Sequence, residues 1–156
     1  AKVITNNYQS YSSGLSRDII KFNRDIFSIN FLPLICYEII YSGRISKNND
    51  FDIIINISED GWFGKSIGPK QHFVHSIFRA IESGKYVLRS ANNGISGIID
   101  PNGNIEKIIE FGKTGYLDFE QQKKFKKTYF SKYGNMIILP VILLYLFLFI
   151  LFAREK

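Results

Sequence analysis

A single cysteine, Cys36, is the strongest nucleophile that the sequence offers. It follows the apolar run F-L-P-L-I at residues 31–35 and precedes Tyr37 and Glu38. A free cysteine is often buried, so a core thiol is one interpretation. The alternative is a nucleophile, because a strand that turns sharply into a helix exposes the turn residue and points helix amides at it. Those amides stabilise a thiolate and supply donors for an oxyanion, and such a thiol can attack a carbonyl carbon.

Other ionisable side chains near Cys36 have open roles. Glu38 is either a carboxylate that supports the cysteine or a solvated acid in the first turn of a helix. His72 and His75 lie three residues apart on a predicted helix, and a metal site would need more ligands than they provide. A dyad of Cys36 with His72 requires a distance that the sequence does not fix. We expect no metal and no other cofactor.

Two further segments carry chemically informative residues. Trp62 and Phe63 lie between two glycines, and exposed aromatic side chains on such a loop indicate lipid contact, packing against a pocket or loop closure. The segment N-N-G at residues 92–94 predicts a tight turn, with contact to a substrate as the alternative.

The elements that must position these residues alternate along the chain. Residues 25–35 and 51–58 predict buried strands, residues 37–48 a short helix, and residues 86–91 a third strand. Pro69 fits the first turn of a helix that Gly84 closes. The turn D-P-N-G at residues 100–103 joins a pair of strands. This order predicts a layered α/β domain.

The end of the chain predicts a membrane segment. Residues 136–153 carry no charge and would span about 27 Å as a helix, enough to cross a bilayer core; a buried core helix is the alternative. Residues 121–132 hold five lysines and no acid, which favours contact with anionic lipid headgroups over nucleic acid.

Composition sets the broad class of the protein. The chain has 156 residues, 46% of them hydrophobic and 22% charged, with a net charge of +6, as in a folded protein. One cysteine excludes a disulfide within the chain. The chain opens without an initiator methionine or an apolar signal, so we expect it to be the C-terminal part of a larger protein. The predicted regions are an N-terminal loop region of a truncated domain at 1–24, a catalytic part at 25–120, a basic linker at 121–135 and a transmembrane helix at 136–153.

Several motifs together are characteristic of one family. They are C-Y-E at 36–38, W-F-G-x-S-x-G-P-x-Q-H at 62–72, R-A-x-E at 79–82 and N-N-G-x-S at 92–96, with T-Y-F-S-K-Y-G-N before the terminal apolar helix. From about residue 11 to its end, the chain resembles the C-terminal part of the apolipoprotein N-acyltransferases, membrane-embedded members of the nitrilase, or carbon-nitrogen hydrolase, superfamily. The resemblance implies part of a nitrilase-like α-β-β-α sandwich followed by one transmembrane helix.

The resemblance also implies a reaction. In this family a cysteine takes an acyl chain from a phospholipid as a thioester and passes it to the N-terminal amine of a diacylglyceryl-cysteine lipoprotein. Cys36 matches the nucleophile, Tyr37 the residue whose amide contributes to the oxyanion hole, and Glu38 a supporting carboxylate. Trp62 and Phe63 match an aromatic loop near the lipid entrance. Where the family would have Asn, this chain has Glu59.

The family's catalytic glutamate and lysine lie upstream of the matched segment. Lys2, Lys21 and Glu59 match neither of them, so we expect the chain alone to be inactive, with an N-terminal half encoded separately as one source of the missing groups. The alternatives are a membrane-tethered amidase of the nitrilase type and a non-catalytic membrane-anchored domain that binds a partner.

Location follows from the same resemblance. The family implies the inner membrane of a bacterium with the catalytic domain in the periplasm. The distribution of positive charge points the other way, because five lysines precede the apolar helix and only Arg154 and Lys156 follow it.

Overall fold

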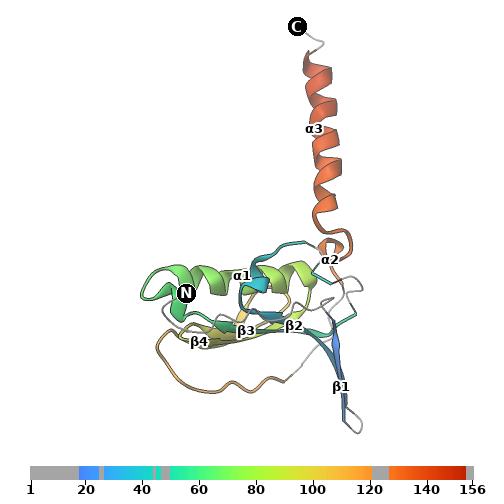
Figure 1. Cartoon of the computed structure of the whole chain (residues 1–156). Coiled ribbons are helices and arrows are strands. Elements are labelled where there is room, and N and C mark those ends of the chain that lie inside the picture. The colour runs from blue at the N-terminus through green and yellow to red at the C-terminus, as the bar shows by residue number, and fades with distance from the viewer. Residues whose placement is uncertain (1–17, 25–26, 44, 47–49, 121–126, 154–156) are drawn as a thin grey trace, which may run out of the picture.

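The computed structural model shows one six-stranded mixed sheet with helix α1 along one face and helix α3 projecting away from it (Figure 1). It describes residues 18–24, 27–43, 45–46, 50–120 and 127–153. The strands are β1 (Ile20–Arg24), β2 (Phe27–Ile35), β3 (Ile53–Glu59), β4 (Tyr86–Asn92), β5 (Ser96–Ile99) and β6 (Ile105–Ile109). The helices are η1 (Cys36–Ile40), η2 (Gly61–Phe63), α1 (Gly68–Ser83), α2 (Tyr129–Tyr133), η3 (Gly134–Ile137) and α3 (Ile138–Ala153).

The centre of the sheet is parallel. Strands β2, β3 and β4 run in the same direction, with Ile35 opposite Ile57 and Ser58 opposite Ala91. Strands β1, β5 and β6 are antiparallel to their neighbours. This arrangement confirms the predicted α/β class and the hairpin around the D-P-N-G turn. The carboxyl ends of β2, β3 and β4 meet at one edge of the sheet, where Cys36 begins η1.

The main core lies between the sheet and α1. Alternate residues of each strand point to opposite faces, and Leu34, Ile54 and Val87 face the helix, where they pack in one cluster with Phe73 and Ala80. Gly84 ends α1 in the left-handed conformation, and Pro69 lies in its first turn, as predicted.

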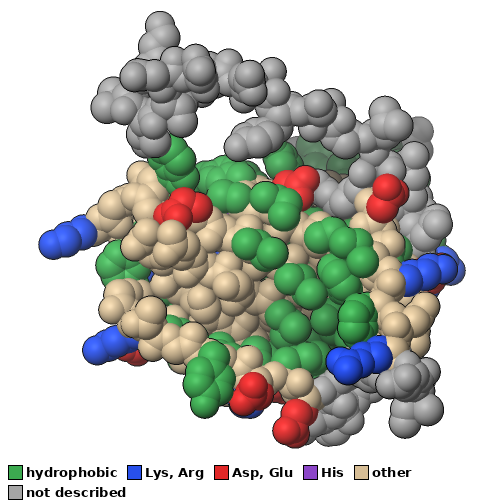
Figure 2. Space-filling model, turned by 60° about the horizontal axis from the view of Figure 1, so that its bottom comes forward, with side chains coloured by type: hydrophobic (Ala, Val, Ile, Leu, Met, Phe, Trp, Pro, Cys, Tyr) green, Lys and Arg blue, Asp and Glu red, His purple; other side chains and the backbone are tan. Residues whose placement is uncertain are grey.

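The opposite face of the sheet is apolar and only partly covered. Ile29, Phe31, Ile55 and Leu88 form a second cluster there with Ile53, Tyr86, Ile98, Leu117 and Phe119. Strand alternation places Ile57 on the same face, and 57% of its surface is exposed. Figure 2 shows hydrophobic side chains gathered on this side of the molecule. We call the surface of Ile29, Phe31, Ile55, Ile57 and Leu88 the open sheet face.

The C-terminal helices lead away from the domain. Thr128 caps α2 by accepting a hydrogen bond from the backbone N–H of Ser131, and its hydroxyl donates to the carbonyl of Glu82 at the end of α1. Within the helical segment Tyr129–Ala153, the most apolar 18 residues have a mean hydropathy of 3.0, and none of this stretch is buried. The helical segment Tyr129–Ala153, which ends in α3, is long and apolar enough to cross a membrane.

The structure differs from the predicted regions in three places. Residues 20–24, predicted as part of a loop region, form β1, because Ile20 and Phe22 alternate with polar residues and pair with β2. Residues 129–135, predicted as linker, are helical because Thr128 supplies a cap. The helix after Cys36 is shorter than predicted and begins at the cysteine itself. Residues 1–17, including Lys2, residues 121–126, Arg154 and Lys156 lie outside the described part of the chain.

Candidate active site

Cys36 occupies a backbone conformation that is unusual for its type. Its φ angle is 48°, in the left-handed region, which costs energy for a residue with a Cβ atom. The thiol is partly exposed, and its Sγ atom lies 3.9 Å from the carbonyl oxygen of Glu59 at the end of β3. Glu38 accepts a hydrogen bond of 2.7 Å from the backbone N–H of Ile35 and so closes the turn from β2 into η1. The chain therefore holds a strained turn with the thiol at the edge of the sheet.

Arg79 supports the same turn from α1. Its guanidinium donates to the carbonyls of Ile39 and Ile40, at 3.3 and 3.0 Å, and pairs with Glu82 at 2.7 Å. Because Arg79 is 2% exposed, these contacts tie η1 firmly to the helix. Arg79 and Glu82 are the charged residues of the R-A-x-E motif.

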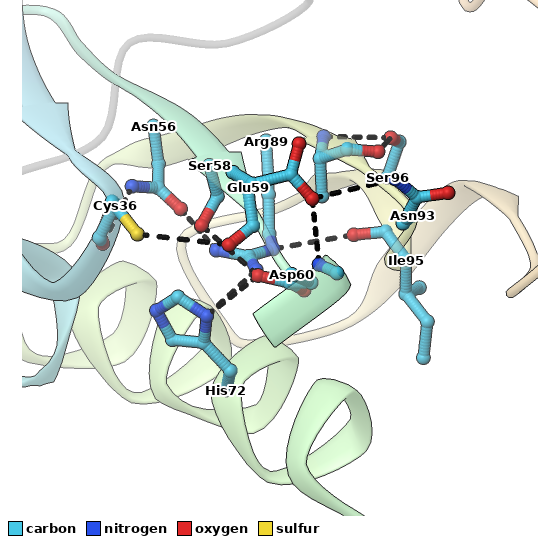
Figure 3. Close-up of polar contacts among 12 residues, drawn as sticks. Cys36, Asn56, Ser58, Glu59, Asp60, His72, Arg89, Asn93, Ile95 and Ser96 are labelled. Carbon is cyan, nitrogen blue, oxygen red and sulfur yellow. Dashed lines mark hydrogen bonds and ion pairs between the residues drawn. The ribbon is translucent and has the colours of Figure 1, made fainter. Parts of the chain in front are cut away.

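A buried polar network lies behind the cysteine, between the sheet and α1 (Figure 3). Arg89 on β4 donates to both carboxylate oxygens of Asp60, at 3.0 and 2.8 Å, and to the side-chain oxygen of Asn56. Ser58 donates to Asp60 at 3.1 Å, and Nδ1 of His72 lies 2.8 Å from the same carboxylate. Nη2 of Arg89 lies 3.2 Å from the same Nδ1.

The network is closed to solvent and balanced in charge. Asn56 and Asp60 are fully buried, and Arg89 is 3% exposed. Burial lowers the pKa of Arg89, and the charge of Asp60 and its hydrogen bond oppose that shift. Removing one partner of such a pair leaves a buried charge without compensation, at a cost of about 3–5 kcal/mol.

The N-N-G turn packs against the loop after β3. Glu59 accepts hydrogen bonds from the backbone N–H of Gly61 at 2.6 Å and from the side chain of Asn92 at 2.5 Å. The Gly61 and Asn92 bonds lower the pKa of the Glu59 carboxyl. Asn93, with a φ of 52°, contacts the same carboxylate at 3.4 Å. Glu59, where the resemblance led us to expect Asn, thus links two loops.

A groove of about 440 Å³ opens beside the turn. The Tyr37 and Phe63 rings lie 5.3 and 5.6 Å from the His72 ring, and all three side chains line the groove with Gln71 and His75. Within the described residues, Nε2 of His72 is buried and has no hydrogen-bond partner. The structure brings Phe63 to Tyr37, whereas Trp62 is 67% exposed and is not among the residues that line the groove.

The structure lacks the contact between Cys36 and His72 that the sequence allowed, and it contains a polar network that the sequence analysis did not identify. His72 pairs with Asp60, and the recorded partner of the Cys36 thiol is the Glu59 carbonyl, so the structure shows no dyad between Cys36 and His72. Among the described residues, no three metal-ligating side chains cluster. Sequence reasoning missed Asn56, Asp60 and Arg89. A polar residue inside an apolar strand, as in I-I-N-I and V-L-R, was the available signal.

Comparison with known proteins agrees with this geometry. The sequence profile of the carbon-nitrogen hydrolases matches residues 18–120. The chain belongs to the carbon-nitrogen hydrolase family. Its fold is similar to that of a carbon-nitrogen hydrolase superfamily protein from Xanthomonas campestris, with a TM-score of 0.50 at 18% identity, covering 67% of this chain and 43% of that one.

Closer sequence relatives are bacterial enzymes named apolipoprotein N-acyltransferase. The chain is 45% identical over 120 residues to the one from Rickettsia bellii, which covers 76% of this chain and 24% of the relative. It is 42% identical over 124 residues to the one from Wigglesworthia glossinidia brevipalpis, covering 78% and 25%. The chain therefore spans about a quarter of the length of these family members.

Proposed function

We propose that the chain is the C-terminal part of an apolipoprotein N-acyltransferase and that Cys36 is its nucleophile. The observation that carries the proposal is the strained turn at Cys36. It presents a partly exposed thiol at the carboxyl edge of parallel strands in a carbon-nitrogen hydrolase domain. Strain of this kind is retained where surrounding contacts over-determine the backbone, which is common at catalytic residues.

The first half-reaction forms a thioester. A base removes the proton of Cys36, and the thiolate attacks an ester carbonyl of a phospholipid. The carbonyl becomes an oxyanion, which the backbone N–H of Tyr37 stabilises, and the ester C–O bond then breaks. The lysophospholipid leaves with a proton on its freed hydroxyl, and the acyl group remains on sulfur. Glu38 serves this step by holding the turn through the N–H of Ile35.

The second half-reaction returns the free thiol. The amine of a diacylglyceryl-cysteine at the N-terminus of a lipoprotein attacks the thioester carbonyl, the C–S bond breaks and an amide forms. The amine loses one proton to the base and Cys36 regains one. The net reaction moves an acyl group from oxygen to nitrogen without a redox change or a cofactor.

The base and the cation that stabilises the oxyanion come from another part of the enzyme. Glu59 lies near the thiol through its carbonyl, but its carboxylate is engaged by Gly61 and Asn92 and its pKa is lowered, which suits a clamp and not a base. Losing either catalytic group typically costs a factor of about 10² or more. We therefore propose that the chain alone does not transfer acyl groups.

The missing part of the catalytic domain packs on the open sheet face. This face is apolar, and a chain that matches 43% of a related structure leaves more than half of such a domain to cover it. Exposed Ile57, which no described element covers, fits an inter-sheet core and not a solvent surface. The N-terminal half of the domain, in the same or a separate chain, is the occupant that we propose.

The membrane supplies both the acyl donor and the anchor. Exposed Trp62 lies on the loop beside the groove, where it can contact lipid, and Phe63 lines the groove itself. Helix α3 anchors the domain, and we assign the complete enzyme to a bacterial inner membrane with this domain in the periplasm, as the resemblance to the apolipoprotein N-acyltransferases implies.

A chimera tests the proposal directly. The matching C-terminal quarter of the Rickettsia bellii relative is replaced by this chain, and the purified protein is given phosphatidylethanolamine vesicles and a diacylglyceryl-cysteine peptide. We expect an acyl adduct on Cys36 by mass spectrometry, release of lysophospholipid and acylation of the peptide. The C36S chimera should yield none of these products.

Two results would overturn the proposal. A folded chimera that leaves Cys36 unmodified would exclude the nucleophile assignment. Release of ammonia from small amides, with no lysophospholipid formed, would instead favour an amidase. The chain alone, assayed under the same conditions, should remain free of acyl adduct.

A further inference from the structure

The backbone on both sides of the Cys36 thiol is held by one buried amide. Nδ2 of Asn56 donates to the carbonyl of Leu34 at 2.9 Å and to the carbonyl of Cys36 at 3.3 Å. These two carbonyls lie on either side of the left-handed turn, so the Asn56 side chain on β3 holds both ends of the turn. Asn56 is fully buried and offers its amide hydrogens to no other described group.

Arg89 determines which way that amide faces. Nη1 of Arg89 donates to Oδ1 of Asn56, which leaves the NH₂ group of Asn56 directed at the two carbonyls. The guanidinium is itself fixed in three directions: Nε donates to the carbonyl of Ile95 at 3.2 Å, Nη2 donates to Asp60, and Nη1 contacts Asn56. A planar, forked cation satisfies all three directions at once, which a lysine ammonium does not.

The charge of Arg89 also lies near the thiol. The other ionisable groups around Cys36 are Glu38 on η1, Glu59 and Asp60 at the end of β3, and His72 on α1. Burial lowers the pKa of Arg89, while Asp60 and then an ionised Cys36 act in the opposite direction. Arg89 is the cation of this set that contacts Asn56 directly: its Nη1 donates to Asn56, and its Nη2 pairs with Asp60.

We propose that Arg89 is the positioning residue of Cys36: it orients Asn56 against the turn that bears the thiol and places a buried positive charge beside the thiolate. The inference rests on the proposed function only in taking Cys36 as the reacting group. Its test measures the thiol directly and needs no acyl transfer.

The lone cysteine makes that test specific. The full chain, purified in detergent micelles, is alkylated with iodoacetamide across a range of pH, and mass spectrometry follows the single adduct on Cys36. Iodoacetamide reacts with the thiolate, so the pH midpoint of the rate reports how strongly the site favours ionisation. We expect R89Q to raise the midpoint and D60N, which leaves Arg89 uncompensated, to lower it.

A charge-balanced variant removes the risk that a single substitution unfolds the protein. In the double variant R89Q/D60N no buried charge is left unpaired, and we expect the midpoint to rise, by less than in R89Q. Lys85→Gln is the matched control: it removes one positive charge from the residue before β4, at the far end of that strand, and should leave the midpoint unchanged. Circular dichroism verifies that each variant retains its helix and strand content.

The positioning role is tested by a second quantity, the limiting alkylation rate of Cys36 at high pH. N56L keeps Arg89 and its charge but removes the two hydrogen bonds to the turn, so we expect an unchanged midpoint and a changed limiting rate at high pH. In R89K the charge remains but Asn56 loses its donor, so its limiting rate should follow that of N56L. A midpoint in R89Q/D60N equal to that of the parent chain would overturn the electrostatic part, and parental limiting rates in both N56L and R89K would overturn the positioning part.

Discussion

At the scale of single residues, the turn at Cys36 and the loop after β3 are held by polar side chains that bind backbone groups. Glu38 binds the N–H of Ile35, Asn56 binds the carbonyls of Leu34 and Cys36, and Glu59 binds the N–H of Gly61. Each contact fixes a loop at the carboxyl edge of the sheet. A thiol in a left-handed conformation needs this support, because its backbone would otherwise relax to a more favourable region.

Ionisation of Glu59 should make the mobility of the loop after β3 depend on pH. Its pKa is lowered from 4.5, mainly by the N–H of Gly61 and the side chain of Asn92, so the ionised form stabilises the loop. That stabilisation is complete above pH 4.5 and is lost as the pH falls through the lower pKa of the folded state. Trp62, the only tryptophan, lies on this loop and reports its mobility through fluorescence anisotropy. We expect the anisotropy of Trp62 to fall as the pH drops below 4.5.

The E59Q variant is the control for that experiment. Glutamine retains an acceptor for Gly61 but does not titrate, so its Trp62 anisotropy should stay flat over the same range. An identical acid transition in both proteins would assign the change to general unfolding and would rule out the Glu59 clamp.

At the scale of elements, the central strands and α1 were predictable because their signals are local. Apolar runs at β2 and β3, Pro69 at the start of α1, Gly84 at its end and the D-P-N-G turn each specify structure from a few neighbouring residues. Strand β1 was less clear, because its two apolar residues stand next to a segment rich in Ser and Asn.

The polar network was not predictable from local patterns. Arg89 meets Asn56, 33 residues earlier, only because β3 and β4 pair in parallel with these two residues opposite each other. A shift of one residue in that register would place Arg89 on the other face of the sheet. Cys36, Tyr37 and Glu38 were predicted as site residues from one short motif, whereas the side chains that hold this turn come from elements distant along the chain.

The turn between β4 and β5 packs closely against the buried polar network at Gly94. A Cβ atom at Gly94 would lie 2.3 Å from Oδ2 of Asp60, in a buried position. We expect G94A to displace Asp60 and lower the free energy of unfolding by about 1–3 kcal/mol. Gly115→Ala is the matched control, because its Cβ would make an ordinary contact of 3.4 Å with Ile109. Denaturant unfolding of both variants in micelles tests this, and equal stabilities would argue against a tight packing requirement at Gly94.

At the scale of the whole molecule, the sheet has one face covered by helices and one apolar face that is only partly covered. Helix α1 and η1 cover one side of the sheet, while the other side exposes apolar residues over the same strands. Helix α3 has none of its most apolar stretch buried, as expected of the membrane anchor that we propose. Both features agree with the chain spanning about a quarter of its acyltransferase relatives.

The open sheet face therefore yields a binding prediction. The upstream part of the Rickettsia bellii relative, produced as a separate chain in the same cells, should co-purify with this chain. I57K places a charge in the proposed inter-sheet core, and we expect it to reduce the co-purified fraction at least tenfold, because an unpaired charge is costly to bury. Ile67→Lys, at a residue 66% exposed and just before α1, should bind as the parent does. Equal loss in both variants would indicate nonspecific aggregation, and unchanged binding of I57K would place the upstream half elsewhere on the domain.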